Sequence, residues 1–230
     1  ANSLMKFHPD LDLIIYTEKD VGEKINFYKA TPMFARELIK KYDLVLKLDA
    51  DQIITGSLDY IFEQEYDFGG VINYNRTDPK TFGYVKVWDI NPFEYFNAGF
   101  VALKSKRFID HWWSLCNRPY FNNYQYKEQD LMNIMIHYGD YKINSFDRAD
   151  RVHDYHSWHG LLSKGEWNKI VMKGDKLILP KNGDYPEEDK QIRVIHWGGG
   201  KDAVKMNYKI YFKEEVIKRL DYLTSETKKT

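Results

Sequence analysis

The chain has 230 residues, 43% of them hydrophobic, which is enough to bury one sizeable core, so we expect a single domain over residues 1–230. Its 34 Lys and Arg equal its 34 Asp and Glu, and the lack of a basic surplus argues against a nucleic-acid partner. The mean hydropathy is −0.62 and no apolar run approaches the roughly 18 residues of a membrane span, so the sequence predicts a soluble protein.

Cysteine usage gives a second constraint. The one cysteine, Cys116, cannot close an intramolecular disulfide or build a zinc cluster, which suits a reducing compartment. No basic and apolar series typical of a signal peptide follows Ala1. We therefore expect a cytoplasmic location.

The first elements alternate between helix and strand. Asn2 to Phe7 resembles the second half of an amphipathic helix that His8-Pro9 stops, so we expect a preceding strand to be missing from the chain. Leu11 to Thr17 is apolar and rich in β-branched residues, which predicts a buried strand. Thr31-Pro32 then predicts the start of a helix that ends at Lys40 or Lys41.

The alternation continues along the chain. We expect strands at Leu44 to Leu48 and Tyr66 to Tyr74, with a short helix at Ser57 to Phe62 between them. This order predicts an α/β fold with helices around a sheet whose central strands are mostly parallel. The composition of residues 75–94 predicts an exposed loop with weak strand character around residues 84–87.

The second half repeats these patterns. Phe96 to Leu103 predicts a strand, and Lys106 to Cys116 and Glu128 to His137 predict helices. Residues 145–167 are irregular and rich in His, Trp and Asp. Arg193 to Trp197 predicts a last strand before three glycines, and Tyr208 to Leu223 a closing amphipathic helix with a frayed tail over residues 224–230.

Two Asp-x-Asp pairs occur, and only one is placed for function. Asp10 and Asp12 precede a predicted strand, whereas Asp49 and Asp51 directly follow one. Open α/β sheets bind ligands beyond the carboxyl ends of their strands, where two carboxylates can share one divalent cation. The pair Asp49 and Asp51 is therefore the candidate metal site.

Four stretches carry a resemblance to a known family. LVLKLDADQIITGSLDYIF resembles the metal-binding segment of nucleotide-sugar-dependent glycosyltransferases of the family 8 type, which includes glycogenin and lipopolysaccharide galactosyltransferases. FNAGFVAL, EQDLMN and HWGGGK are similar to three further motifs of that family, in the family's order. The resemblance extends from Tyr42 to Lys201. It implies the GT-A fold, which is α/β with a Rossmann-like sheet and a small antiparallel element, and sugar transfer from a nucleotide diphosphate.

The resemblance implies a metal site. In the family, the residues matching Asp49, Asp51 and His196 bind Mn²⁺ or Mg²⁺, which holds the donor diphosphate. This agrees with the chemistry, because a divalent cation stabilises the charge of a departing diphosphate. A core histidine at a strand end is the alternative reading of His196.

Other residues are implied to contact the donor. Gly199 and Lys201 would approach its phosphates, although the family lysine falls one position later, so Lys205 is an alternative to Lys201 and a plain glycine turn is an alternative to both. Asn97 would bind hydroxyls of the transferred sugar, or serve only as an ordinary strand residue. Arg36 resembles the family arginine that contacts the donor.

The predicted helix at residues 128–137 opens on the expected catalytic residues. Glu128, Gln129 and Asp130 would face the donor sugar, although an acid at a helix N-terminus can also be no more than a cap. Tyr16 and Thr17, at the end of a predicted strand, are expected base or ribose contacts.

Residues 153–167 are expected to meet the acceptor. If this segment is a loop, it resembles a surface that stacks on sugars, with plain surface packing as the alternative; its residues are His153, His156, His159, Trp158 and Trp167. If it is a helix, the three histidines would form a metal-binding stripe.

The expected function is a metal-dependent glycosyltransferase that moves a hexose from a UDP-sugar to a hydroxyl, with retention of configuration. Three alternatives stay open: an inactive carbohydrate-binding domain, an inverting enzyme with Glu128 or Asp130 as base, and a glycoside hydrolase that uses both acids. The closing helix could rest on a membrane surface, but docking on the domain is the preferred role.

Overall fold

The fold is that of a computed structural model, which describes most of the chain. The chain forms two compact units. The described residues are 1–22, 26–72, 89–91, 94–146, 152–153, 164–181, 188–196 and 212–226. One unit, here called the first, comprises Ala1–Leu13, Asp49–Tyr60 and Asp147–Thr230. The second unit comprises Ile14–Leu48 and Ile61–Phe146. The architecture is α/β, as the sequence predicts.

The second unit is built on a mixed four-stranded sheet. Its order is β1 (Val45–Leu48), β4 (Phe96–Leu103), β3 (Phe68–Ile72), β5 (Ile143–Phe146). β4 runs antiparallel to both β1 and β3, and β5 runs parallel to β3. β1, β3 and β5 therefore run in one direction, as the sequence predicts for most of the sheet, and β4 runs opposite to them between β1 and β3.

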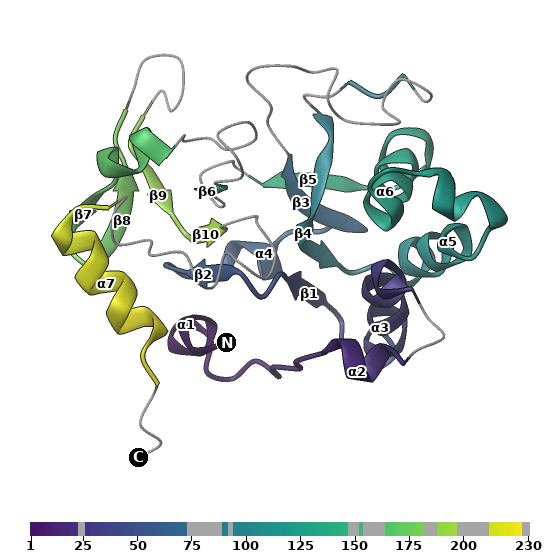
Figure 1. Ribbon diagram of the computed structural model, residues 1–230, viewed down its shortest axis with the longest axis horizontal. Coiled ribbons are helices and arrows are strands. Elements are labelled where there is room, and N and C mark those ends of the chain that lie inside the picture. The colour runs from purple at the N-terminus through teal and green to yellow at the C-terminus, as the bar shows by residue number, and fades with distance from the viewer. Residues whose placement is uncertain are drawn as a thin grey trace. The chain divides into compact units, whose positions relative to one another are not determined.

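Three helices pack around an aromatic core against this sheet: α3 (Ala30–Leu38), α5 (Lys106–Cys116) and α6 (Lys127–Tyr138). The other helical elements are α2 (Glu18–Val21), α4 (Tyr60–Glu63) and the 3₁₀ turns η1 (Phe27–Lys29) and η5 (Pro119–Asn123). Ser105 caps α5 by accepting a hydrogen bond from the Phe108 N–H at 3.2 Å. The buried positions Phe108, Trp112 and Cys116 recur every four residues, which turns one face of α5 to the core. Figure 1 shows α5 lying beside both α3 and α6.

The first unit contains two small sheets. One has the order β2 (Gln52–Ile54), β10 (Val194–His196), β6 (Val152–His153). The other is an antiparallel meander of β7 (Val171–Lys173), β8 (Lys176–Leu179) and β9 (Lys190–Ile192). Its helical elements are α1 (Asn2–Phe7), α7 (Glu214–Thr224) and the 3₁₀ helix η7 (Lys164–Lys169). The sequence analysis assigns no strand to residues 171–192.

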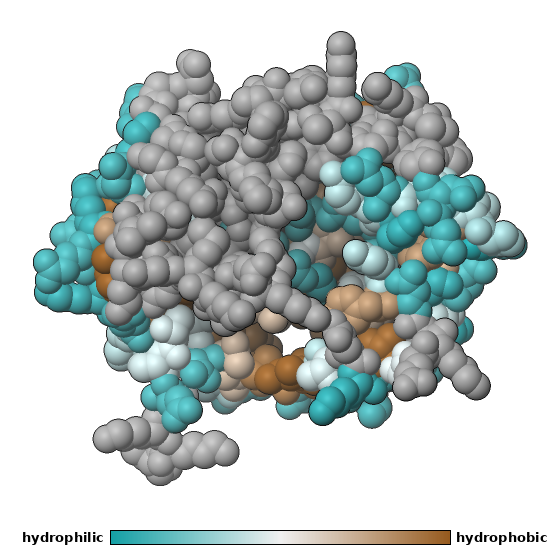
Figure 2. Space-filling model, in the orientation of Figure 1, coloured by the Kyte–Doolittle hydropathy of each residue, from teal (hydrophilic) through white to brown (hydrophobic). Residues whose placement is uncertain are grey.

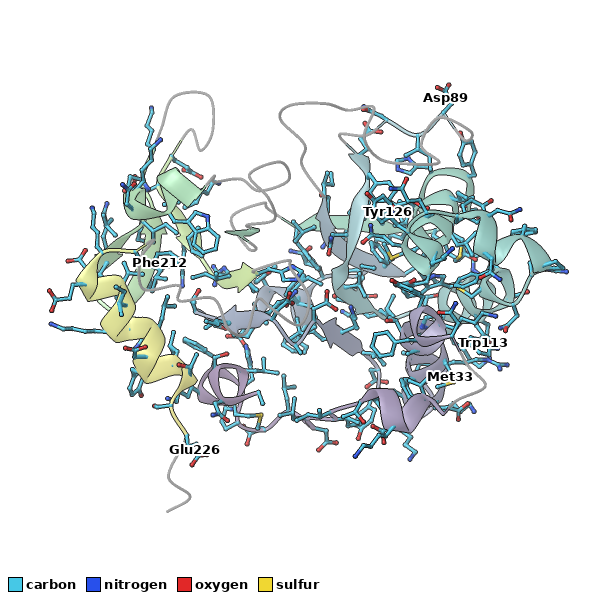
Figure 3. All side chains as sticks on the ribbon, viewed as in Figure 1. Met33, Asp89, Trp113, Tyr126, Phe212 and Glu226 are labelled. Carbon is cyan, nitrogen blue, oxygen red and sulfur yellow. The ribbon has the colours of Figure 1, made fainter. Side chains whose placement is uncertain are left out.

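Helix α7 docks on this unit through its apolar face. Val216 and Leu220 are fully buried in a cluster with Trp167, Phe212 and Ile195. The ring of Phe212, labelled in Figure 3 near the start of α7, lies 4.9 Å from that of Trp167. The outer side of α7 is hydrophilic in Figure 2. Docking on the protein itself is the role that this packing supports for the helix.

One predicted strand is wrong. Residues 11–17 are not paired into a strand, and the side chains of Leu13, Ile14, Ile15 and Tyr16 are all exposed, with Ile15 67% accessible. Instead the ring of Tyr16 stacks on that of Phe34, with centroids 3.5 Å apart. An apolar run forms a buried strand only where a neighbouring strand and a core receive it, and the run itself cannot provide either.

Two predicted segments lie largely or partly outside the described residues. They are the loop at residues 75–94, with its weak strand at residues 84–87, and the tail at residues 224–230. Among the helices in the described ranges, none has the length and apolar character needed to cross a bilayer.

Candidate functional site

Two carboxylates and an imidazole form a compact cluster in the first unit. His196 Nε2 lies 2.9 Å from Asp51 Oδ1 and 3.6 Å from Asp49 Oδ2. One ligand atom of each residue lies within 4.8 Å of the others, a span that a single cation can bridge. The structure thus brings together all three residues that the sequence analysis proposes as metal ligands.

Strand pairing explains how residues 145 positions apart meet. β10 runs antiparallel to β2, and the register sets His196 opposite Gln52. Asp51 precedes Gln52 directly, and Asp49 stands two residues earlier in the turn that leads into β2. β10 also pairs in parallel with β6, which places the backbone of His153 next to His196 in register.

The donor set and its graded exposure fit a divalent cation. His196 is buried, the Asp51 side chain is 12% exposed, and that of Asp49 is 40% exposed. Carboxylate oxygens and an imidazole nitrogen together suit Mn²⁺, and carboxylate oxygens alone also suit Mg²⁺. The open side at Asp49 leaves room for further ligands from a bound substrate.

In the second unit, the first turn of α6 is joined to β4 by hydrogen bonds. Gln129 Oε1 accepts a hydrogen bond from the Ala98 N–H at 2.8 Å, and Gln129 Nε2 donates to Tyr95 Oη at 3.3 Å. The Tyr95 hydroxyl donates to Asp130 Oδ1 at 2.6 Å, and the Tyr126 N–H donates to Asp130 Oδ2 at 2.8 Å. Figure 3 labels Tyr126 at the start of α6. Gln129 and Asp130 are therefore turned toward β4.

Asn133 extends this connection by one helical turn. Its side-chain oxygen accepts from the Phe96 N–H at 2.6 Å, and its amide nitrogen donates to the Phe96 carbonyl at 2.9 Å and to the Gln129 carbonyl at 2.8 Å. Asn133 is completely buried. Phe96 is the residue immediately before Asn97, so the amide of Asn133 fixes the backbone at the start of the predicted sugar-binding segment.

Lys47 holds the same segment from β1. Its ammonium donates to the Ala98 carbonyl at 2.8 Å. The sequence did not predict a role in the site for Lys47, Tyr95 or Asn133. The features that could have indicated one are a lysine inside the strand VLKL, a tyrosine directly before FNAGF, and an asparagine on the apolar face of the helix that begins with EQD.

Asn97 itself is half-buried on β4. Its side-chain oxygen accepts from the Gly99 N–H at 2.6 Å. That bond leaves the amide nitrogen, which carries two donors, as the group that Asn97 can offer to a ligand oxygen.

The burial of Asp130 and its existing hydrogen bonds disfavour a role as the acceptor of a substrate proton. Asp130 is only 3% exposed, and both of its oxygens already accept hydrogen bonds. Burial raises its pKa above the usual value, while the hydrogen bond from Tyr95 acts in the opposite direction. Burial, and after it the nearby Asp130, raises the pKa of Tyr95 well above its usual value, so the hydroxyl stays protonated and donates.

The raised pKa of Asp130 leads to a testable dependence of stability on pH. The folded state binds the Asp130 proton more tightly than the unfolded state, so this contribution to stability is present below the unfolded pKa of about 4 and is lost as pH rises through the folded pKa. Asp130→Asn removes the titration, so relative to wild type the variant should gain stability as pH rises. Urea unfolding of both proteins between about pH 3 and about pH 8 measures the difference. A difference that is constant across this range would contradict the expectation.

Three other predicted donor contacts have local partners. Arg36 Nε pairs with Asp110 Oδ1 at 2.6 Å. Hydrogen bonds from Lys106 and, to a smaller extent, from Arg36 lower the pKa of Asp110. The Thr17 N–H and hydroxyl both donate to Asp20 Oδ2 at 2.7 Å at the start of α2. Tyr16 is the residue stacked on Phe34. The donor contacts of Arg36, Tyr16 and Thr17 stay predictions.

The remaining predicted residues are only partly described. Glu128 lies in the first turn of α6, and its backbone carbonyl accepts a hydrogen bond from Trp112 Nε1 at 2.9 Å. Gly199, Lys201 and the alternative Lys205 lie outside the described residues. So do His156, His159 and Trp158, and of His153 only the backbone is described. Trp167 is described, and it is completely buried in the core of the first unit.

Solved structures with a similar fold are glycosyltransferases. The galactosyltransferase LgtC, in complex with donor and acceptor sugar analogues, matches with a TM-score of 0.54 at 14% identity, over 98% of this chain and 91% of that chain. An active-site mutant of LgtC matches with a TM-score of 0.53 at 14% identity, over the same shares. The bifunctional glycosyltransferase WbbM matches with a TM-score of 0.51 at 16% identity, over 85% of this chain and 36% of that chain.

The likeness is one of fold. No protein-family model matches the sequence, and no curated protein matches it. At 14 to 16% identity, the structural matches establish that this chain has the GT-A fold of these glycosyltransferases, as the sequence motifs predict.

Proposed function

From the GT-A fold and the cluster of Asp49, Asp51 and His196, we propose that this protein is a metal-dependent glycosyltransferase. It transfers a hexose from a UDP-sugar to a hydroxyl group of a glycan or other acceptor, with retention of configuration. The observation that carries the proposal is the cluster itself. Its three ligand atoms, from the first and the last of the four sequence motifs, lie within 4.8 Å of one another.

In this proposal the donor diphosphate binds at the cluster of Asp49, Asp51 and His196. These three residues would hold one Mn²⁺ or Mg²⁺, which would supply Lewis-acid stabilisation of the diphosphate leaving group. The buried His196 fixes its side of the site, whereas the more exposed Asp49 lies on the side that a substrate can enter. Gly199 and Lys201, which follow His196 in the chain, are proposed to contact the phosphates.

Asn97 is the proposed contact of the transferred sugar. The Asn97 amide donates hydrogen bonds to hydroxyls of the transferred sugar, and the start of α6 holds that amide in place. The pairing of Asp130 with Tyr95 and Tyr126 argues against Asp130 as the base of an inverting enzyme. It also argues against a hydrolase with paired acids, because such a reaction needs both carboxyl groups to reach the substrate.

Removing the metal tests the proposal. With Mn²⁺ present, we expect the protein to release UDP from at least one UDP-sugar of a panel, by hydrolysis or by transfer of the sugar. This activity should stop when EDTA is added and recover when excess Mn²⁺ is restored. Release of UDP measures turnover, and Mn²⁺-dependent thermal stabilisation by each UDP-sugar identifies the donor.

The same assay separates the alternatives. A glycoside hydrolase would cleave glycosides without regard to EDTA. An inactive carbohydrate-binding domain would bind sugars but release no UDP. Either result would contradict a metal-dependent transferase.

A further inference from the structure

The backbone around Asn97 is held by side chains. The strand registers pair residues 100–103 of β4 with β1, and residues 96 and 101–103 with β3, so residues 97–99 lie between the paired positions. Within this interval the Ala98 N–H donates to Gln129 and the Ala98 carbonyl accepts from Lys47, so side chains bind both backbone polar groups of Ala98. The position of Asn97 therefore depends on these side chains as well as on the sheet.

The Tyr95 hydroxyl determines how Gln129 is oriented. A side-chain amide can rotate by half a turn and exchange its oxygen for its nitrogen. Only the orientation with the oxygen toward the Ala98 N–H makes a hydrogen bond there, and in that orientation the nitrogen faces the Tyr95 oxygen. The hydroxyl accepts from Gln129 because its own proton is directed to Asp130 at 2.6 Å. Asp130, Tyr95, Gln129 and Ala98 thus form one chain of hydrogen bonds.

The backbone leads into this chain of hydrogen bonds through an unusual residue. Lys127, the first residue of α6, has a φ of +49°, in the left-handed region that side chains other than glycine rarely adopt. The strained residue stands two positions before Gln129 and three before Asp130. Strain of this kind persists where the surrounding contacts over-determine the conformation, as they do here.

We propose that Tyr95 is a positioning residue for sugar recognition. Its hydroxyl fixes the amide of Gln129, which fixes the Ala98 peptide, so that Asn97, with its oxygen held by Gly99, presents its amide nitrogen to a sugar hydroxyl. This inference rests on the proposed function, and assigns Gln129 and Asp130 to holding Asn97 instead of touching the reacting atoms. The buried, protonated hydroxyl of Tyr95 has no direct contact with substrate in this scheme.

Tyr95→Phe tests the proposal, because it removes the hydroxyl and keeps the ring. The affinities of the 230-residue chain for UDP, UDP-glucose and UDP-galactose are measured by calorimetry with saturating Mn²⁺. We expect the preference for the better UDP-sugar over UDP to fall about tenfold, the equivalent of about 1.4 kcal/mol, while the affinity for UDP itself is unchanged. A merely structural role would not separate the sugar from the nucleotide.

Tyr66→Phe is the matched control. Tyr66 is a buried tyrosine of the same unit whose hydroxyl donates to the Ile61 carbonyl at 2.7 Å, away from α6. It should retain the wild-type preference for UDP-sugar. If Tyr95→Phe unfolds, Gln129→Met provides the second variant, since methionine is similar in length and cannot bond the Ala98 N–H or the Tyr95 hydroxyl.

The outcomes distinguish this inference from the proposed function. A wild-type protein that binds no UDP-sugar with Mn²⁺ overturns both. Normal binding by wild type, with the preference unchanged in folded Tyr95→Phe or Gln129→Met, overturns the positioning role alone. An equal loss in Tyr66→Phe also overturns it, because the effect would then follow from any lost buried hydroxyl.

Discussion

Asp51→Ala is expected to abolish sugar transfer while leaving the fold nearly intact. Asp51 contributes the oxygen nearest His196 Nε2, at 2.9 Å, so its loss removes a central member of the proposed metal site. Loss of groups that only support a metal ligand typically costs 10- to 100-fold in metal affinity, so removal of Asp51 should cost more than about 100-fold. Calorimetric titration with Mn²⁺ and UDP release measure the two effects.

Asp12→Ala is the control for this prediction. Asp12 belongs to the other Asp-x-Asp pair of the sequence and is exposed. Its replacement should leave Mn²⁺ affinity and turnover as in wild type. Undiminished turnover in Asp51→Ala would refute the site, and circular dichroism of both variants establishes whether the fold is retained.

Asn133→Ala is expected to cause the largest loss of stability among the variants considered. The change removes three hydrogen bonds and leaves the buried N–H and carbonyl of Phe96 without the side chain that binds both. A buried polar group that loses its partner costs about 1–3 kcal/mol, so the free energy of unfolding should fall by about 2–5 kcal/mol. Urea unfolding monitored by circular dichroism measures this change.

Asn122→Ala provides the comparison for Asn133→Ala. Asn122 lies exposed in η5, in the same unit. Exposed substitutions of this kind usually change stability by less than about 0.5 kcal/mol. A loss in Asn133→Ala no larger than that of Asn122→Ala would show that the α6–β4 connection contributes little to stability.

The predicted elements illustrate where local sequence information suffices. The sequence predicts α5 and β4 at their observed bounds, because α5 carries a periodic apolar face with a clear start and end, and β4 is a nearly continuous run of small and apolar residues. The predicted helix from Glu128 to His137 differs from the observed α6 by one residue at each end. The meander β7–β8–β9 was not predicted, since its strands have only three or four residues each and short patterns are ambiguous.

The sequence identifies several candidate site residues, but not the contacts that these residues make. The position of Asp49 and Asp51 after a strand is a property of the sequence, and the similarity of HWGGGK to a family motif suggests His196. Sequence motifs also indicate that Asn97, Gln129 and Asp130 belong to one site. They do not reveal that Gln129 and Asp130 turn toward Tyr95 and Ala98, because a motif records which residues are present and not which partners they face.

The sequence by itself determined the α/β class, the order of the main helices and strands, and the choice of Asp49, Asp51 and His196 as candidate metal ligands. Only the tertiary structure decided that β4 enters the sheet antiparallel, that residues 11–17 remain unpaired as a strand, and that the pairing of β2 with β10 brings His196 to Asp51. Periodicity and turn signals act over a few neighbouring residues, whereas register and burial depend on partners far away in the chain.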